Sequence, residues 1–92
     1  DVLKAAQERE LASAIESLEG VEAARVIIAQ PEPSPFVRDR APVTASVTVT
    51  LAPGRALSEA QSRAIIHLVA GAVPGLSPDH VAIADQTGRL LA

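Results

Sequence analysis

The chain has 92 residues, a formal net charge of −3 and one aromatic residue, Phe36. Its eight basic residues are dispersed, so the sequence lacks the basic face and stacking aromatics that are typical of nucleic-acid binding. It has no cysteine, which excludes disulfides and thiolate metal sites. The length predicts a single domain over residues 1–92, with a core built from small aliphatic side chains.

The sequence predicts no membrane-spanning segment. No apolar run approaches the roughly 20 residues that cross a bilayer, and no signal peptide is visible. Because residue 1 is Asp, we interpret the chain as a fragment of a longer protein whose membrane segments could lie outside it.

The first predicted element is a helix over residues 2–18. Leu11, Ile15 and Leu18 are spaced four and three residues apart, as on the buried face of an amphipathic helix. Gly20 is a natural stop, since glycine accepts a left-handed backbone. We expect this helix to face the core, with partner binding as the alternative.

The second element is a strand over residues 21–30. Val26, Ile27 and Ile28 break strict alternation, which predicts a strand that is apolar on both faces and lies in the middle of the sheet. If Val26 and Ile28 face the helices, Ile27 lies on the opposite face beside Arg25. It is then a candidate contact with another subunit.

A proline-rich connection follows over residues 31–42. Its four prolines exclude a regular helix and a central strand. We interpret it as a stiff excursion between two strands, with a polyproline ligand as the alternative. Phe36 would either close over the edge of the domain or insert into a neighbour.

The clearest strand covers residues 44–51. Ala45, Val47, Val49 and Leu51 alternate with hydroxyl-bearing residues, which predicts one face in the core and one face open to water.

The second helix is predicted to begin at Ser58 and to end at residues 73–75. Ser58 and Gln61 have the spacing of a capping box. We expect its buried stripe to consist of Ile65, Leu68, Val69 and Ala72. Ile66 falls off that stripe and is predicted to be exposed or to serve an interface.

The C-terminal part is predicted to form a turn and a short third strand. The turn covers residues 77–79 and the strand residues 81–84. Residues 85–88 have the composition of a tight turn that closes a hairpin or bulge.

These elements predict an α+β fold with the order helix, strand, strand, helix, strand. We expect the first strand to lie between the other two, which gives a split βαβ unit with both helices on one sheet face. The other sheet face would be uncovered in a monomer, which is the main physical hint of assembly.

The sequence offers no catalytic constellation. His67 and His80 are the only histidines, and we expect both to be solvated, because a metal site needs three or four converging ligands. Phosphate-binding loops, nucleophile elbows and dinucleotide fingerprints are missing from the sequence. We therefore predict neither an enzyme nor a cofactor.

Taken in combination, several segments resemble the YscJ/FliF family, in its flagellar M-ring branch. They are Ala24–Val26, Pro31–Phe36 with Arg38, Ala45–Val47, Pro53–Leu57, His67–Val69, Val73–Pro78 and Val81–Leu91. One departure is Ile27-Ile28, where many relatives have His before the next apolar residue.

The resemblance implies a periplasmic ring-building domain, the second of its series, in a large homo-oligomeric ring of the bacterial inner membrane. That ring supports the rod and houses the export gate. The implied partners are other copies of the chain, neighbouring ring-building domains of the same chain, and export-gate and proximal rod proteins. The resemblance implies no catalytic residue.

We predict that the open sheet side of one copy meets the helix side of the next. The candidate contacts are Arg25, Ile27, Thr48 and Thr50 on the sheet side, Arg63, Ile66 and His67 on the helix side, and Phe36 in the loop. The rival hypothesis is a monomeric periplasmic adaptor, or a related type III secretion inner-ring domain, that binds a partner through the proline-rich loop.

Overall fold

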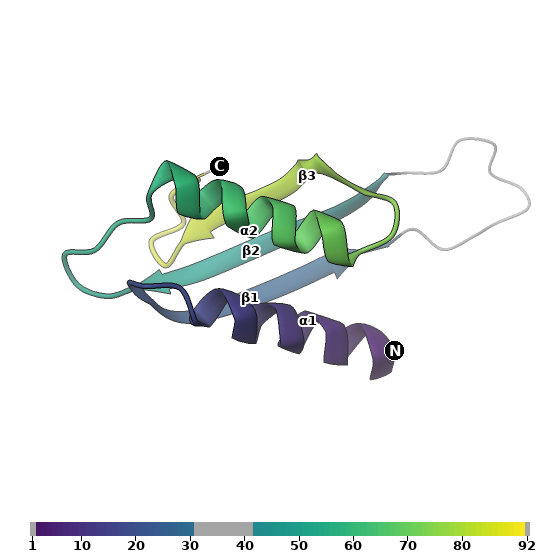
Figure 1. Ribbon diagram of the computed structural model, residues 1–92, viewed down its shortest axis with the longest axis horizontal. Helices are drawn as coiled ribbons and strands as arrows, with labels where there is room; N and C mark the ends of the chain where they lie inside the picture. Colours follow the sequence, from purple (N-terminus) through teal and green to yellow (C-terminus); the bar gives the residue numbers. More distant parts are fainter. Residues whose placement is uncertain (1, 31–41, 92) are drawn as a thin grey trace, which may run out of the picture.

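The computed structural model describes residues 2–30 and 42–91, with side-chain surroundings from Ala5 onward. The elements are α1 (Val2–Glu16), β1 (Val21–Ala29), β2 (Val43–Leu51), α2 (Glu59–Ala72) and β3 (Leu76–Asp85). Two helices cover one face of a three-stranded sheet (Figure 1). The predicted element order is confirmed. Phe36 and most of the proline-rich connection lie outside the described residues.

The order of the strands differs from the prediction. The sheet runs β1-β2-β3, with β1 and β2 antiparallel and β2 and β3 parallel. The expectation that the first strand lies in the middle was wrong, and so was the split βαβ unit, since β2 and β3 are adjacent. The continuous apolar run in β1 arises because Ile27 lies on the uncovered face, where it is 50% exposed, and not because β1 has two neighbours.

An irregularity near Glu22 explains the side-chain pattern of β1. Val21 pairs with Leu51 and Ala23 with Thr50, so β1 has one extra residue at this point. Such a bulge reverses the phase of the alternation. As a result, both Val21 before it and the predicted pair Val26 and Ile28 after it point into the core.

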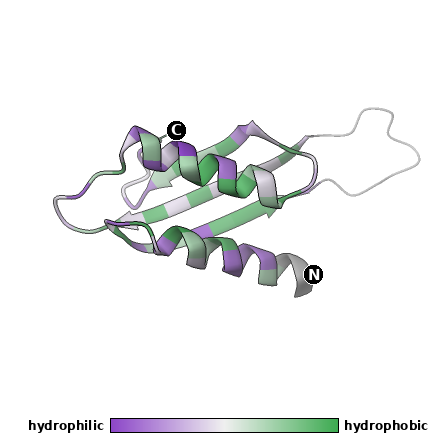
Figure 2. Ribbon diagram, viewed as in Figure 1, coloured by the Kyte–Doolittle hydropathy of each residue, from purple (hydrophilic) through white to green (hydrophobic). Residues whose placement is uncertain are grey.

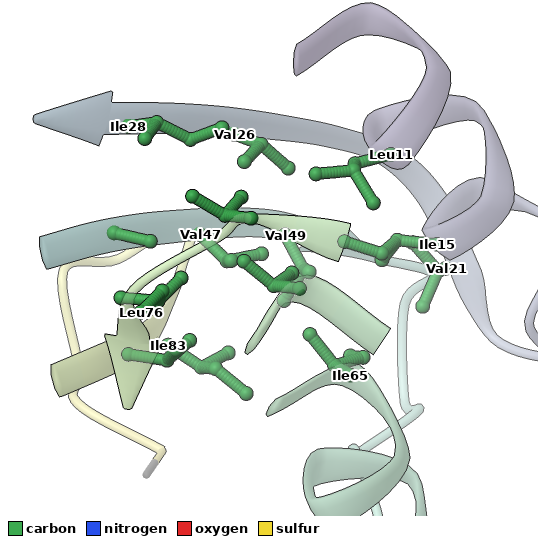
Figure 3. Packing of buried hydrophobic residues seen from close by; sticks show 14 of the residues in the cluster. Leu11, Ile15, Val21, Val26, Ile28, Val47, Val49, Ile65, Leu76 and Ile83 are labelled. Atoms are coloured by element: carbon green, nitrogen blue, oxygen red, sulfur yellow. The ribbon is translucent and has the colours of Figure 1, made fainter. Parts of the chain in front are cut away.

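The core lies between the helices and the covered face of the sheet (Figure 3). Ile15 of α1, Val49 of β2, Val69 of α2 and Ile83 of β3 have no exposed surface. Figure 2 shows hydrophobic residues along much of β1 and β2, beneath the helices. Among the described residues the core side chains are aliphatic, as predicted, so many small contacts hold the two layers together.

The N-terminus of α2 confirms the predicted capping box. The Gln61 N–H donates to Ser58 Oγ at 3.0 Å, and the Ser58 N–H donates to Gln61 Oε1 at 3.0 Å. These two bonds satisfy backbone donors that the first helical turn cannot satisfy itself.

The buried stripe of α2 is rotated relative to the prediction. Ser62, Ile65 and Val69 are buried, whereas Leu68 is 40% exposed and Ala72 is exposed. Ile66, which we expected off the stripe, is partly buried against the core. The periodicity of this apolar helix fits either rotation, and packing on β3 selects one of them.

The third strand is longer than predicted, because residues 77–79 lie inside β3 and do not form a separate turn. Val43 pairs with Leu76 and Ala45 with Val81, so the register shifts across this segment. An edge strand tolerates Pro78 here, because proline offers no N–H to a neighbouring strand. The predicted tight turn over residues 85–88 is present, and Leu90 returns to bridge Ala84.

Candidate assembly surfaces

The uncovered sheet face carries the four residues predicted for the sheet side. Arg25 and Thr48 are cross-strand partners and are both exposed, and Ile27 pairs with Ser46. Thr50 is partly exposed next to its partner Ala23. The structure therefore brings these residues onto one surface, which we call the open face. Their role as subunit contacts stays a prediction.

On the helix side, Arg63 and Ile66 line a shallow depression of about 550 Å³. The other lining residues are Leu57, Glu59, Ser62 and Leu91. Arg63 also forms an exposed ion pair with Glu59 at 3.5 Å, one helical turn away. Such pairs are worth only about 0.3–0.5 kcal/mol, so Arg63 is free to exchange partners in an assembly. His67 is exposed one turn further along α2 and does not line the depression.

A second hollow lies between α1 and α2, where sequence reasoning placed no site. This interhelical groove of about 300 Å³ is lined by Gln7, Glu10, Leu11, Ala14, Leu68 and Ala72. The Gln7 Nε2–H donates to the Ala72 carbonyl at 2.8 Å and links the two helices. The one residue in the sequence that could have indicated this groove is the apolar Leu68, but the spacing of apolar residues in α2 predicted that Leu68 would be buried in the core.

The outer edge of β1 is covered by carboxylates of α1. Glu8 Oε2 accepts the Ile28 N–H at 2.7 Å, and Glu16 Oε2 accepts the Ala24 N–H at 3.0 Å. Unpaired edge groups otherwise invite pairing with a strand of another molecule. Because these two donors are already bonded, strand addition to β1 is disfavoured.

The outer edge of β3 is partly closed by the C-terminal residues. The Leu91 N–H donates to the Ile83 carbonyl at 2.7 Å, and the Asp85 N–H donates to the Arg89 carbonyl at 3.0 Å. Both sheet edges are thus occupied over part of their length, which leaves the open face and the helix side as the broad surfaces for association.

The surface carboxylates serve local structure. Hydrogen bonding from the Ser77 hydroxyl holds the pKa of Asp79 below its ordinary value. The Thr87 hydroxyl, aided by backbone N–H groups, does the same to the pKa of Asp85. A general acid or base would need a pKa moved toward neutrality, which is the opposite direction.

Within residues 2–30 and 42–91, the structure contains no cluster of three or more His, Asp or Glu side chains that could hold a metal ion. In the same ranges every buried side-chain nitrogen or oxygen has a hydrogen-bond partner. No helix among the described residues is both long and apolar enough to cross a bilayer.

These features define a class of protein: a small two-layer scaffold domain with two dissimilar faces. The family model described as "Secretory protein of YscJ/FliF RBM domain" matches residues 2–92, and the chain belongs to this family. The fold is that of its ring-building domains.

The sequence relatives agree on one branch of the family. The chain is 56% identical over 86 residues to the flagellar M-ring protein of Salmonella typhimurium, covering 94% of this chain and 15% of the relative. It is 54% identical over 86 residues to the flagellar M-ring protein of Escherichia coli K12, covering 94% of this chain and 16% of the relative. The chain thus spans about a sixth of the length of these proteins.

Solved structures agree with this assignment. A FliF fragment covering residues 58–213 of its own protein superposes with a TM-score of 0.82 at 45% identity, over 92% of this chain and 55% of the fragment. The type III secretion protein EscJ of enteropathogenic E. coli superposes with a TM-score of 0.72 at 18% identity, over 91% of this chain and 47% of EscJ. The second likeness concerns the fold alone.

The family is structural and non-enzymatic, which confirms the prediction that this domain is not an enzyme. The resemblance to the flagellar branch is likewise confirmed.

Proposed function

We propose that residues 1–92 form one ring-building domain, the second of its series, that homo-oligomerises into the inner-membrane MS ring of the bacterial flagellar basal body. The domain lies on the periplasmic side. The ring supports rod assembly and houses the export gate. The relatives' name as flagellar M-ring proteins and the shared fold support this proposal.

The observation that carries the proposal is the difference between the two faces of the domain. One face of the sheet is covered by α1 and α2, and no helix among the described residues covers the other (Figure 1). When unlike surfaces meet, each copy keeps one free surface of each kind. A repeated contact of this type closes into a ring if its rotation permits.

Each contact in such a ring can be weak. The exposed residues of the open face are mostly small and hydroxyl-bearing. Its large apolar residues among those described are Ile27 on β1 and, at the far edge beside Ala84, Leu90. Tethering to the membrane and closure of the ring raise the effective concentration of neighbours. An isolated domain that is monomeric in dilute solution is therefore compatible with ring building by the whole protein.

The proposed partners are further copies of the chain, neighbouring ring-building domains of the same chain, and export-gate and proximal rod proteins. The rival hypothesis assigns the binding role to the proline-rich loop, most of which lies outside the described residues. Deletion of residues 33–38 separates the two. Loss of partner binding with rings intact would favour the adaptor. If the deletion affects neither partner binding nor ring formation, the ring role stands.

The test uses the lack of native cysteine. Thr48→Cys and Arg63→Cys are introduced together into the full-length protein in membranes, which are oxidised and run on a non-reducing gel. We expect a ladder of multimers that needs both substitutions. Monomer alone, in a protein that electron microscopy shows to be assembled, would mean that the ring forms through other surfaces.

A further inference from the structure

We propose that Ile27 of one copy inserts into the interhelical groove of the next copy. Arg25 of the first copy then pairs with Glu10 of the second. This inference rests on the proposed function and adds to it a partner for the groove, namely a second copy of this chain, and a register for the contact.

The first argument is the position of the exposed apolar side chains. Among the described residues, the large hydrophobic side chains that are exposed are Ile27 at 50%, Leu68 at 40% and Leu90 at 68%. Ile27 lies on the open face, and Leu68 lines the groove on the opposite side of the molecule. An apolar knob and an apolar hollow on opposite sides of a chain favour a head-to-tail contact between copies.

The second argument is the apolar floor of the groove. Leu11, Ala14, Leu68 and Ala72 supply most of its lining. Leu11 is only 5% exposed, so the hollow reaches down to the core. Two small residues, Ala14 and Ala72, leave the space between the helices unfilled. A β-branched side chain such as Ile27 would bury apolar surface there that is otherwise in contact with water.

Charge complementarity points to the same pairing. Glu10 is the one charged residue that lines the groove, since the other polar residue, Gln7, is neutral and bonded to Ala72. Arg25 lies two residues from Ile27 on the same face of β1. Within the described part of the chain, neither Arg25 nor Glu10 takes part in an ion pair.

The spacing of the two pairs is compatible. Side chains two residues apart on a strand are about 6.6 Å apart along it. Packed helices lie about 8–10 Å apart, so Ile27 beside Leu68 leaves the flexible Arg25 side chain within reach of Glu10 on the other helix.

The primary test is a cysteine pair at the proposed contact. Ile27→Cys and Leu68→Cys are combined in the full-length protein in membranes, and multimers are counted after oxidation. We expect a ladder that requires both substitutions. The matched control replaces Leu68→Cys by Leu90→Cys, which is more exposed but does not line the groove, and should give monomer.

A second test does not depend on cysteine geometry. Arg25→Glu and Glu10→Arg are each expected to lower the yield of assembled rings by about five- to tenfold, through a like-charge contact. Combined in one chain, they restore the opposite pairing and should bring the yield back to within about twofold of the original. Circular dichroism of each variant checks that the fold is retained.

The outcomes separate the inference from the proposed function. A ladder from Thr48→Cys with Arg63→Cys, without a ladder from Ile27→Cys with Leu68→Cys and without charge-swap rescue, would overturn the inference and leave the ring role standing. Failure of both cysteine pairs in an assembled protein would overturn the inference and mean that the ring forms through other surfaces, whereas a full-length protein that forms no rings would overturn the proposed function. If a cysteine variant does not fold, the charge-swap experiment is the deciding test. In that case, failure of the double variant to restore ring yield would overturn the proposed contact.

Discussion

Asp85 shows how much one side chain organises at the end of β3. Its Oδ1 atom accepts the Thr87 hydroxyl at 2.6 Å and the backbone N–H groups of Thr87 at 2.9 Å and Arg89 at 3.0 Å. Gly88 adopts a φ of +87°, which a residue with a side chain rarely adopts. These contacts turn the chain back so that Leu91 can bond to Ile83.

We predict that the Thr87 hydroxyl and the backbone N–H groups hold the pKa of Asp85 below its ordinary value in the folded protein. A depressed folded pKa means that the group stabilises the fold at pH above its unfolded pKa. This stabilisation is lost as the pH falls through the folded pKa. The measurement is an NMR titration of the side-chain carboxyl carbon, with the Thr87 and Arg89 amides as reporters of the turn.

The control for this titration is Asp85→Asn, which keeps an acceptor oxygen but cannot titrate. The acid-induced step at the Thr87 and Arg89 amides should disappear in this variant. A midpoint for Asp85 at or above the ordinary value of an aspartate side chain would show that the hydrogen bonds do not favour the ionised carboxyl group.

At the scale of elements, α1 has two roles: it supplies side chains to the core and it covers the edge of β1. Leu11 and Ile15 enter the core, while Glu8 and Glu16 bond to the edge of β1. Glu8 and Glu16 are eight residues apart and therefore about 80° apart around the helix, and both side chains reach the edge of β1. This spacing matches four residues of strand, from Ile28 back to Ala24: about 12 Å of helix against about 13 Å of strand.

We predict that Glu8→Ala lowers the free energy of unfolding of the domain by about 1–3 kcal/mol, because the part-buried Ile28 N–H loses its acceptor. The matched control is Glu10→Ala on the same helix, which makes the same change in helix propensity. Since Glu10 is exposed, the control should stay within about 0.5 kcal/mol of the original.

Urea unfolding followed by circular dichroism measures both variants. Size-exclusion chromatography of Glu8→Ala adds a second readout, because an opened edge favours association through strands. Equal unfolding free energies for Glu8→Ala and Glu10→Ala would show that the carboxylate does not hold the edge.

At the scale of the whole molecule, turns at one end tie the two halves of the chain together. Arg55, after β2, forms an ion pair with Glu19 at 3.2 Å and packs over Gly20, where a Cβ atom would lie 3.2 Å from Arg55 Nε. The Gln61 side chain donates to the Glu19 carbonyl at 3.0 Å. These contacts fix α2 relative to α1, and so they set the shape of the helix side that a neighbouring copy would meet.

We predict that Thr48→Trp and Arg63→Glu each impair ring assembly while the fold is retained. Thr48 is exposed on the open face, and Arg63 is exposed on α2 with only a weak ion pair to lose. Ring yield is measured by electron microscopy of the full-length protein, and the fold by circular dichroism of the domain. Unchanged ring yield for both variants would show that these surfaces do not meet.

The local features of this fold could be predicted from the sequence. The alternation over residues 44–51, the capping box at Ser58 and the left-handed backbone of Gly20 are confirmed, although the first helix ends at Glu16 and not at residue 18. Each depends on residues within one or two turns of one another, so the chain alone encodes it. The alternation also determined that one sheet face would be hydroxyl-rich and uncovered.

The strand order, the rotation of α2 and the interhelical groove were decided only by the tertiary structure. They depend on which residues meet across the chain, as when Ile28 reaches Glu8 or Gln7 reaches Ala72. A bulge at Glu22 changes the phase of β1, and packing on β3 turns Leu68 outward. The spacing of hydrophobic residues and the secondary-structure propensities are compatible with more than one such arrangement. The free energy of long-range strand pairing and side-chain packing selects among them.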